Sequence, residues 1–514
     1  MRKFLALPSK SEYNKKHAYL SPNLYKNRRF GKASILNLFK IEKNEEIFAK
    51  FPYFAWLFQK KVVSLQRILK CVIMLIEPTP AFSQAEAGAI GQKAFSLLFN
   101  ADYQSLIRRI NNDYLYWDKA KYHRPEDVEP AVFWTSIKLM RLANIRTLQF
   151  GQYNFSYTII DKMQALLNQF DMNFGGMLNS ASIIPEQDKQ MYLVSSIMEE
   201  AIASSQMEGA NTTRKVAKEM LRKQQAPVNK DQQMILNNYE TIRYISEHRN
   251  DEFSVPNIKI IHSYISKGTL DDPQMEGTFR TTDDVVVQNS ITGTIVHTPP
   301  TYAQVESMLE ELCAFANDDS VENFIHPIIK ATIIHFMLAY IHPFVDGNGR
   351  TARSLFYWYM IKKGYWLTEY LSISRVIYKS KGSYEKAYIY TEADMNDISY
   401  FIHYNLNAMQ KAYEQLKQWL TEQEKKRRAM KNFVAIEGIN DRQAYLLRLF
   451  SENADLDMRV KEVATRFNVT THTARADLQH LTELGLLREV AIDKKTKAYV
   501  RTTDFAKIVE LLAK

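Results

Sequence analysis

Residues 342–353 read His-Pro-Phe-Val-Asp-Gly-Asn-Gly-Arg-Thr-Ala-Arg, and the sequence on both sides of this stretch indicates its structure. A long apolar run, Pro327–Ile341, precedes it, and a second helix-forming run continues after it through SLFYWYMIKK. Because a proline disfavours helical conformation at the residue before it, Pro343 should end the first helix at His342. The stretch therefore predicts two helices, the first of them buried, joined by a short loop.

The loop and the start of the second helix carry groups suited to binding an anion. Gly347 and Gly349 can adopt positive φ and expose backbone N–H groups. A helix N-terminus that follows such a loop attracts phosphate oxygens through its free N–H donors and its dipole. Arg350 and Arg353 are three residues apart, so they share one face of the helix and can bind two phosphates.

Two further residues of the stretch suggest chemistry as well as binding. His342 has a solution pKa close to neutral, which suits a general base that takes a proton from an incoming hydroxyl. Asp346 offers hard oxygen ligands that can hold Mg²⁺ against phosphate oxygens. Together the residues predict a nucleotide site beside a proton acceptor.

At these residues the sequence resembles the Fic family, whose motif is HPFx(D/E)GN(G/K)RxxR, and every fixed position is met. Family members transfer the AMP part of ATP to a hydroxyl side chain of a target protein; a few transfer other phosphate-containing groups or remove AMP. The resemblance implies that His342 is the base and Asp346 the Mg²⁺ ligand. It also implies a nucleotide site made of Phe344, Gly347, Asn348, Gly349, Arg350 and Arg353, with an anion hole from Asn348 and the two glycine backbones and with the arginines on the β- and γ-phosphates.

A second informative stretch is SSIMEEAIASSQMEGANTT, residues 195–213. Its apolar spacing predicts an amphipathic helix that stops at Gly209, and Ser204 and Glu208 lie on the same face. The stretch resembles the inhibitory helix of the Fic family, (S/T)xxxE(G/N), at Ser204, Glu208 and Gly209. The resemblance implies that Glu208 pairs with Arg353 and occupies the guanidinium that otherwise orients the γ-phosphate.

Two β-branched runs, 285–288 and 294–297, flank turn residues 289–293 and predict a hairpin. In the Fic family such a hairpin is the flap, which lies over the active site and aligns an extended segment of the target by strand addition. The flap residues implied here are Val285, Val286, Val287, Val296 and His297. An ordinary hairpin packed on helices is the alternative.

The last part of the sequence, residues 440–514, predicts a domain of its own. Helices expected at 444–450, 460–467 and 471–484, followed by strands at 486–492 and 498–501, resemble a winged helix-turn-helix. In DNA-binding relatives the third helix enters the major groove, which would present Thr471, His472, Thr473 and Arg475, with Lys494, Lys495 and Lys497 near phosphates. The segment has 13 basic and 11 acidic residues, a net charge of only +2, so docking of a protein is an equal alternative.

The net charge of +10 is concentrated near the N-terminus. Residues 1–70 contain 16 Lys and Arg against 4 Asp and Glu, a net of +12, which leaves 51 against 53, a net of −2, for the rest. A basic arm can bind nucleic acid or an anionic membrane, or can be a solvated tail. The apolar run 68–76 is too short to span a membrane, and translation from Met74 or another downstream start would explain its resemblance to a signal peptide.

The length predicts several domains. We expect a basic, poorly ordered extension at 1–100, a helical segment at 101–159 with a helix over 132–149, a helical domain with the inhibitory helix at 160–247, a Fic core at 248–412, a charged helical connector at 413–439 and the winged helix at 440–514. Only two cysteines are present, which favours a reducing compartment and a cytoplasmic location.

The sequence thus predicts a mainly α enzyme without a membrane span that uses ATP and Mg²⁺. It would transfer AMP to a Ser, Thr or Tyr hydroxyl of a protein partner or of itself. Two alternatives stay open: an ATP-sensing transcription regulator that binds DNA, and a Fic enzyme that removes AMP or uses another nucleotide donor. The sequence fixes neither the target nor the oligomeric state, for which a homodimer is one alternative.

Overall fold

The computed structural model describes residues 76–175, 189–288, 293–429, 433, 436, 438–492 and 497–512, and this part of the chain is mainly α-helical. Within these ranges the strands form three small antiparallel sheets. None of the described helices is long and apolar enough to cross a membrane. The predicted fold class, mainly α with a small hairpin and a C-terminal winged helix, is confirmed.

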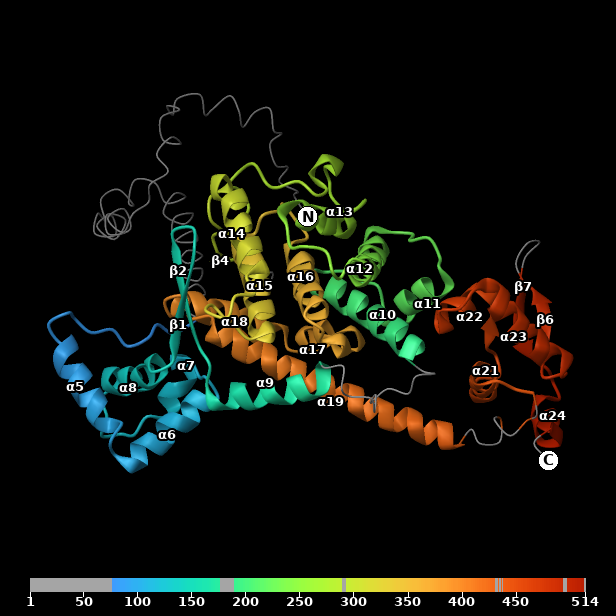
Figure 1. Cartoon of the computed structure of the whole chain (residues 1–514), viewed down its shortest axis with the longest axis horizontal. Helices are drawn as coiled ribbons and strands as arrows, with labels where there is room; N and C mark the ends of the chain where they lie inside the picture. Colours follow the sequence, from blue (N-terminus) through green and yellow to red (C-terminus); the bar gives the residue numbers. More distant parts are fainter. Residues whose placement is uncertain are drawn as a thin grey trace, which may run out of the picture. The chain divides into compact units, whose positions relative to one another are not determined.

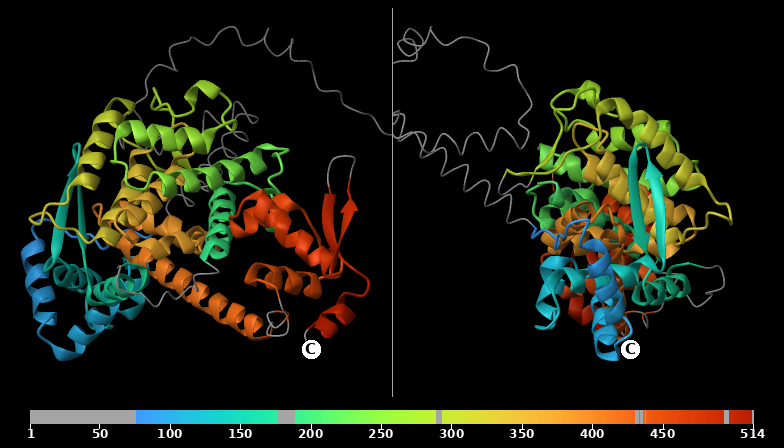
Figure 2. Two further views of the ribbon diagram at one scale, coloured as in Figure 1. Left: turned by 45° about the vertical axis from the view of Figure 1, so that its right-hand side comes forward. Right: turned by 90° about the vertical axis from the view of Figure 1, so that its left-hand side faces the viewer.

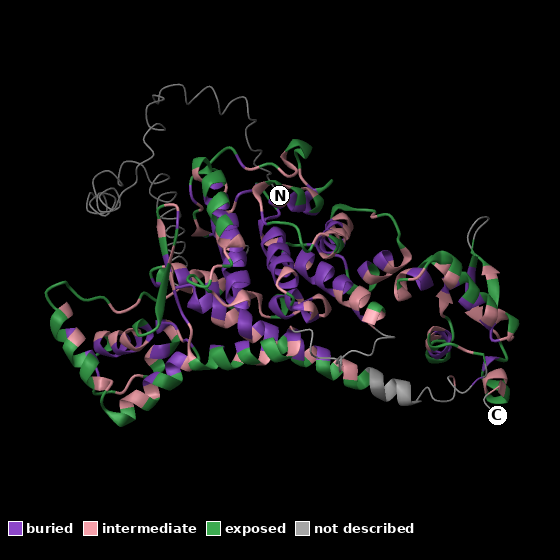
Figure 3. Cartoon of the chain, in the orientation of Figure 1, coloured by how far each residue is buried: buried purple, intermediate pink, exposed green. Residues whose placement is uncertain are grey.

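Two packed helices form the centre of the fold. α15 (Pro327–Ile341) and α16 (Asn348–Lys362) contact each other and are joined by a short loop (Figure 1). Nearly every side chain of α15 is buried, as the purple ribbon in Figure 3 shows. Because its apolar residues surround the helix instead of forming one stripe, α15 is stable only inside a core. The predicted end of this helix before His342 is confirmed.

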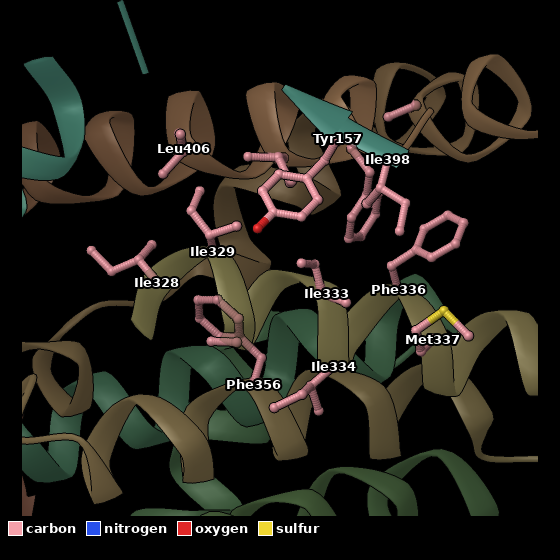
Figure 4. Close-up of a cluster of buried hydrophobic side chains, with 14 of the residues drawn as sticks. Tyr157, Ile328, Ile329, Ile333, Ile334, Phe336, Met337, Phe356, Ile398 and Leu406 are labelled. Carbon is pink, nitrogen blue, oxygen red and sulfur yellow. The ribbon is translucent and has the colours of Figure 1, made fainter. Parts of the chain in front are cut away.

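The core around α15 brings together segments that are far apart in the sequence. Figure 4 shows side chains of α15 packed with Phe356 of α16, Tyr157 of a strand, and Ile398 and Leu406 near and within the long helix α19 (Ser399–Ala429). Burial of this many large apolar side chains is the main stabilising contribution to the fold. The loop after α15 is therefore held at both ends by helices that pack in this core.

The first described helices precede a hairpin. They are α5 (Ala87–Leu97), α6 (Ala101–Asn112), α7 (Trp117–Ala120), the 3₁₀ turn η2 (Lys121–His123) and α8 (Pro130–Leu142). Residues 1–75 lie outside the described part of the chain. The expectation of poor order over 1–100 was wrong for 87–97, which form α5 and pack on α8.

The helix predicted over 132–149 was wrong in its second half. α8 ends at Leu142, and β1 (Ile145–Phe150) and β2 (Tyr153–Thr158) form an antiparallel hairpin, visible face-on in the right view of Figure 2. Gly151, with φ +54°, makes the tight turn, and its N–H donates to Glu311 Oε2 at 2.6 Å. The aromatic and β-branched residues of this stretch prefer a strand once the hairpin packs on the core.

The next elements carry the predicted inhibitory and flap segments. They are α9 (Asp161–Phe174), α10 (Lys189–Met207), α11 (Arg214–Lys223), α12 (Lys230–Glu247), α13 (Val255–Ser266), η4 (Pro273–Met275), β3 (Val287–Gln288), β4 (Ile295–His297), η5 (Tyr302–Gln304) and α14 (Val305–Asn317). α10 packs on α12, and α13 packs on α16. α12 packs on α16 as well, so three helices from before the central motif are linked to the helix that follows it.

The elements after α16 complete the helical body. They are η6 (Trp366–Tyr370), α17 (Ile373–Lys379), α18 (Lys381–Ala393) and α19. α19 begins in the core and continues to residue 429, so the boundary expected at 412/413 falls inside one continuous helix. The charged residues at its end do not interrupt the helix because Glu, Lys and Arg are good helix formers.

The C-terminal elements form a second hydrophobic core. They are α21 (Asp441–Glu452), β5 (Asp457–Met458), α22 (Val460–Phe467), α23 (Thr471–Glu483), β6 (Leu487–Ala491), β7 (Lys497–Arg501) and α24 (Phe505–Leu512), with the strand order β5-β7-β6. The predicted three helices and two strands are confirmed, while β5 and α24 were not predicted. Lys494 and Lys495 lie outside the described residues.

Candidate active site

The loop after α15 begins at His342, which has the left-handed conformation (φ 51°, ψ 58°). Arg280 holds this turn, because its backbone N–H donates to Pro343 O and its Nε donates to His342 O, both at 2.9 Å. The other guanidinium nitrogens of Arg280 donate to the carbonyl groups of Thr282 and Pro300. Arg280 therefore ties the loop to the residues on either side of the flap segment.

The imidazole of His342 is prepared to accept a proton. Its Nδ1 lies 3.1 Å from Ala339 O, and since a carbonyl oxygen only accepts, Nδ1 carries the hydrogen and Nε2 keeps a lone pair. Burial lowers the pKa of His342 to about 4. The hydrogen bond to Ala339 acts against that shift, and the positive charge of Arg280 adds to it. The ring is neutral at pH 7, which is the form a general base requires.

A stacked pair of rings fixes the middle of the loop. The ring of His262, on α13, stacks on Phe344 with centroids 3.6 Å apart. His262 Nδ1 accepts from the N–H of Gly277 at 3.0 Å, and Nε2 lies 2.9 Å from Asp346 O, to which it donates. Burial lowers the pKa of His262 to about 4, so this tautomer stays neutral. Phe344, a predicted nucleotide contact, is fully buried and supports the loop from below.

Gly347 and Asn348 form the junction between the loop and α16. Gly347 has φ +82°, as predicted, and a Cβ there would lie 3.2 Å from His262 Nε2. The Asn348 side chain differs from the prediction of an anion-hole donor. Its Oδ1 accepts from Phe344 N at 2.9 Å and its Nδ2 donates to Phe344 O at 2.8 Å, so the amide clamps the loop. The backbone N–H groups of the first helical turn have no acceptor within the helix and are the groups that an anion there would meet.

Arg350 is a buried guanidinium without enough partners. It is 0% exposed, and its Nη1 donates to Ile265 O at 3.2 Å. Among the described residues, no hydrogen-bond acceptor meets its Nε or Nη2, and Asp346 Oδ2 is 3.7 Å from Nη2. Burial lowers the pKa of Arg350. Because a buried charge without hydrogen bonds is costly, these nitrogens fit a bound phosphate.

Arg353 is bound by the segment predicted to be inhibitory. Its Nε donates to Ser204 Oγ at 2.9 Å, and its Nη2 donates to Ser204 O at 3.0 Å and to Glu208 Oε1 at 2.9 Å. Burial acts to raise the pKa of Glu208, but the Arg353 charge outweighs it, and the pKa lies below its usual value. α10 ends at Met207, and Gly209 takes φ +99° just after it. The three predicted residues thus meet Arg353 or end the helix as expected.

Gly349, whose backbone is predicted to line the anion hole, also leaves room for Glu208. It lies within α16 without a positive φ. A Cβ at this position would overlap Oε1 of Glu208 and lie 3.1 Å from its Cδ. Since the Glu208 carboxylate occupies the space over Gly349, the absence of a side chain there makes room for the contact with Arg353.

Asp346 is the residue of the loop that is most open to solvent among those predicted to act, with 55% of its side chain exposed. Its Oδ1 accepts from Gly347 N at 2.6 Å. One carboxylate beside a site for phosphate fits Mg²⁺, because this ion takes its other ligands from phosphate oxygens and water. The described residues contain no group of three or more His, Cys, Asp and Glu side chains that would bind a metal without such help.

The flap is shorter than predicted. Val287 pairs with His297 and Gln288 with Ile295, with a register shift between the pairs, while Val285 and Val286 precede β3. Val296 and His297 lie in β4. His297 Nε2 donates to Tyr340 O at 2.8 Å, which ties β4 to the last turn of α15. The hairpin is therefore attached beside the loop that follows α15, and the tip residues 289–292 lie outside the described part of the chain.

Sequence reasoning missed His262 and gave Arg280 no role. His262 lies on an apolar helix, where its pattern is that of an ordinary core histidine, and only the fold brings its ring under the loop. Arg280 lies between η4 and β3, outside every helix and strand. No local signal identifies either residue, because each acts on backbone atoms more than sixty residues away.

The predicted DNA contacts of α23 are partly accessible. Thr471, His472 and Arg475 are exposed, and Thr473 is half-buried with its N–H bonded to Thr470 Oγ1 at 3.1 Å. Lys497 lies at the start of β7 and pairs with Glu489 at 3.2 Å.

The segment before α23 contacts the helical body. Glu462, on α22, is fully buried, with Arg222 Nε at 2.9 Å and Arg466 Nη2 at 3.6 Å. Gln224 Nε2 donates to Thr465 Oγ1 at 2.8 Å, and Asn468 Nδ2 donates to Gln190 Oε1 at 3.0 Å. Thr471 lines a cavity of about 660 Å³ at this contact. The first residue of the predicted recognition helix therefore lies near α10 and α12.

Comparisons with known families agree with the two resemblances. Residues 252–360 match the model of the Fic/DOC family, and residues 442–490 match that of the DeoR-like helix-turn-helix domain. The chain therefore carries a Fic domain and a DeoR-like helix-turn-helix domain nearer its C-terminus. The first match includes His342, Asp346 and both arginines, and it ends before α16 does.

Curated relatives match only part of the chain. Protein adenylyltransferase fic-1 of Caenorhabditis elegans is 35% identical over 116 residues, which are 23% of this chain and 21% of the relative. Protein adenylyltransferase Fic of Drosophila grimshawi is 35% identical over 69 residues, 13% of this chain and 14% of the relative. The chain thus spans only about a fifth or less of the length of these relatives.

Similar solved structures include Fic-1 of C. elegans, at 19% identity and a TM-score of 0.41, covering 67% of this chain and 94% of that one. A Fic family protein from Desulfovibrio desulfuricans G20 is 18% identical, with a TM-score of 0.42, covering 68% of this chain and 98% of that one.

Proposed function

We propose that the Fic domain transfers AMP from ATP to the hydroxyl of a Ser, Thr or Tyr side chain of a protein, and that Glu208 restrains this reaction. The observation that carries the proposal is the combination of a neutral histidine at the end of α15 with two buried guanidiniums at the start of α16. A proton acceptor beside a prepared phosphate site is what phosphoryl transfer to a hydroxyl needs. The relatives named protein adenylyltransferase agree with this reaction.

In the proposed reaction each of these groups has its own role. Nε2 of His342 removes the hydroxyl proton of the target, and the oxygen attacks the α-phosphorus of ATP. A new P–O bond forms, the bond to the β-phosphate oxygen breaks, and pyrophosphate leaves with the electron pair. Arg350, Arg353 and the N–H groups of the first turn of α16 hold the phosphates, so that catalysis comes from positioning and charge stabilisation.

Mg²⁺ would be held by Asp346 together with phosphate oxygens, where its charge would help to neutralise the leaving group. The arrangement of the loop does not depend on the ion, because Arg280, His262 and Asn348 fix the loop through hydrogen bonds within the protein. We therefore propose that Asp346 binds the metal and that Arg280, His262 and Asn348 position the loop.

Glu208 restrains the reaction by competing for Arg353. The guanidinium cannot bind a carboxylate at 2.9 Å and a γ-phosphate with the same Nη2 atom. With Glu208 in place, ATP would bind with its α-phosphate out of line with the incoming hydroxyl. Both groups are in one chain, so the restraint requires no second protein.

Labelling with α-phosphate-radiolabelled ATP and Mg²⁺ tests the proposal. We expect weak labelling of protein by the wild type, strong labelling by Glu208→Gly, and loss of that gain in Glu208→Gly with His342→Ala. The loss should be on the order of 10²- to 10⁴-fold, the usual contribution of a general base. Glu247→Gly, at an exposed helix end, is the matched control and should label like the wild type.

Two results would contradict the proposal. Equal labelling by wild type and Glu208→Gly would remove the inhibitory role of Glu208. Labelling that persists in the double variant would remove His342 as the base. Comparison of ATP with GTP, UTP and CTP in the Glu208→Gly protein tests the nucleotide, and release of AMP from a labelled target tests the reverse reaction, in which Glu208 would position water.

A second function is DNA binding by the winged helix, which the match of residues 442–490 to a DeoR-like helix-turn-helix domain favours. In this proposal α23 enters the major groove and presents His472 and Arg475, both exposed. The two functions are compatible, because the winged helix and the catalytic loop belong to separate hydrophobic cores. A mobility-shift assay with and without ATP separates a nucleotide-sensing regulator from an enzyme that happens to bind DNA.

A further inference from the structure

A second pocket lies in the helical body, away from the catalytic loop. It has a volume of about 250 Å³ and is lined by α10, α11, η6, α17 and α19. None of the residues that line it belongs to the stretch 342–353. Charged side chains and hydroxyl groups form its polar walls. Its apolar walls include Tyr192 and Trp419, whose rings pack edge to face with their centroids 4.2 Å apart.

Three cations and one carboxylate line the pocket. Glu199, on α10, is 7% exposed and accepts from Arg214 Nε at 2.7 Å and from Lys218 Nζ. Arg214 and Lys218 keep 51% and 36% of their side-chain surface exposed, so each has donors left over. Glu199 therefore cancels one of three positive charges, and the pocket keeps a net charge of about two.

Arg375, on α17, is the third cation. Among the described residues no hydrogen bond or ion pair reaches its guanidinium, although the side chain is half-buried. Its charge acts on Lys218, because burial first, and then the neighbouring Arg214 and Arg375, lower the pKa of Lys218. A half-buried guanidinium that repels its neighbours is unfavourable until an anion joins it.

Hydroxyl groups and rings narrow the chemistry of that anion. Ser195, Ser196 and Ser372 line the same pocket and offer neutral donors. Hydroxyls together with arginines suit the several oxygens of a phosphate group. The volume of about 250 Å³ is below the roughly 300–1,000 Å³ typical of sites for drug-sized ligands, which favours a small molecule over a nucleoside triphosphate.

We propose that this pocket binds a small phosphate monoester, with the phosphate between Arg214, Lys218 and Arg375 and the organic group against Trp419 and Tyr192. The site is distinct from the ATP site and does not depend on the transfer reaction. Four of its lining residues belong to α10, the helix that continues to Ser204 and ends just before Glu208.

Isothermal titration of the full chain with phenyl phosphate tests the site, with phenol as the uncharged control and inorganic phosphate as the ligand without an organic group. We expect phenyl phosphate to bind more tightly than inorganic phosphate, and phenol not to bind. Arg375→Gln should weaken phenyl phosphate about tenfold or more, because it removes hydrogen bonds between charged groups. Since no hydrogen bond or ion pair of Arg375 is broken, this variant should keep the melting temperature of the wild type.

Two matched variants assign the signal to the pocket. Arg243→Gln, on an exposed face of α12, should bind phenyl phosphate like the wild type. Arg350→Gln removes a guanidinium of the ATP site and should likewise keep this binding. The proposal is overturned if Arg375→Gln binds phenyl phosphate as tightly as the wild type, or if Arg350→Gln alone abolishes the binding, because the ligand would then occupy the catalytic loop.

Discussion

The catalytic loop and the winged helix both present arginines, but the two regions hold them differently. At the start of α16, just after the loop, Arg350 and Arg353 are 0% and 3% exposed, and neighbouring backbone and side chains fix their positions. In the winged helix, Arg475 is exposed, and Arg466 is committed to the buried Glu462. The arginines of α16 are therefore in fixed positions before an anion binds. The exposed Arg475 of the winged helix has to become ordered when it binds.

In the proposed mechanism this difference bears on regulation. Guanidiniums that are already fixed in place bind phosphate without further ordering cost, so a restraint on the reaction has to occupy one of them, as we propose for Glu208 at Arg353. Exposed side chains lose conformational entropy when they bind, which weakens binding without any competitor.

The largest effect should come from acid, and it should fall on the helical body. Burial lowers the pKa of His262 to about 4 and that of His335 to about 3. Below a pH of about 6.5 the unfolded chain binds protons that the folded chain does not, so stability decreases as the pH falls from 6.5 towards 4. The two histidines together should cost about 4 kcal/mol at pH 5.

Thermal melting at pH 7 and pH 5, followed by tryptophan fluorescence, measures this effect. None of the six tryptophans lies in residues 440–514, and five lie between 117 and 419, so the signal does not report the winged helix. His335→Gln, which can keep a hydrogen bond to Tyr384, should reduce the pH dependence, and the exposed His123→Gln should not. A melting temperature that is equal at both pH values would contradict the neutral, buried state of these rings.

Gly349→Ala should activate the enzyme. The new Cβ would occupy the position of Glu208 Oε1, which must leave Arg353, while alanine is favourable within a helix. Coupling energies between sites are typically 1–3 kcal/mol, so labelling should rise on the order of 5- to 150-fold. The same change in a Glu208→Gly background should give no increase. A decrease of labelling in both backgrounds would show that Gly349 serves the nucleotide and not the restraint.

Arg475→Ala should weaken DNA binding by the winged helix without changing AMP transfer. Loss of one base or phosphate contact typically costs about 1–3 kcal/mol, or about tenfold in affinity. Mobility shifts at several salt concentrations provide the measurement, since a lost phosphate contact also reduces the salt dependence. Arg488→Ala, exposed on β6, is the matched control. Unchanged affinity in Arg475→Ala would favour docking of a protein over binding of DNA.

The smallest effect is expected at the contact between α11 and α22. Arg222→Ala removes a partner of the buried Glu462 and weakens the contact that places Thr471 near the body. If DNA requires α23 to be free, affinity should rise a few-fold, because a larger fraction of molecules is then able to bind. Lys215→Ala, at an exposed position of the same helix, should have no effect. Weaker DNA binding in Arg222→Ala would show instead that the docked arrangement is the binding form.

Much of the site was predictable because its residues are close in sequence. The end of α15 and the start of α16 follow from an apolar run, a proline and two glycines, and these signals are local. The hairpin at 145–158 was not predictable in the same way, because its residues continue the amphipathic pattern of α8 and become strands only through packing on the core. The same reason hid His262 and Arg280, whose partners are distant in sequence.

By itself, the sequence determined the order of groups along the catalytic loop: a base, a carboxylate, glycines and two guanidiniums, at spacings that one turn and one helix impose. It also determined the three helices and the wing strands of the C-terminal domain. The contacts of each group are set by folding. Folding placed Glu208 over Gly349, gave the Asn348 amide to Phe344, and left Arg350 buried with unpaired nitrogens, because contacts, burial and pKa values depend on neighbours that the chain brings together only on folding.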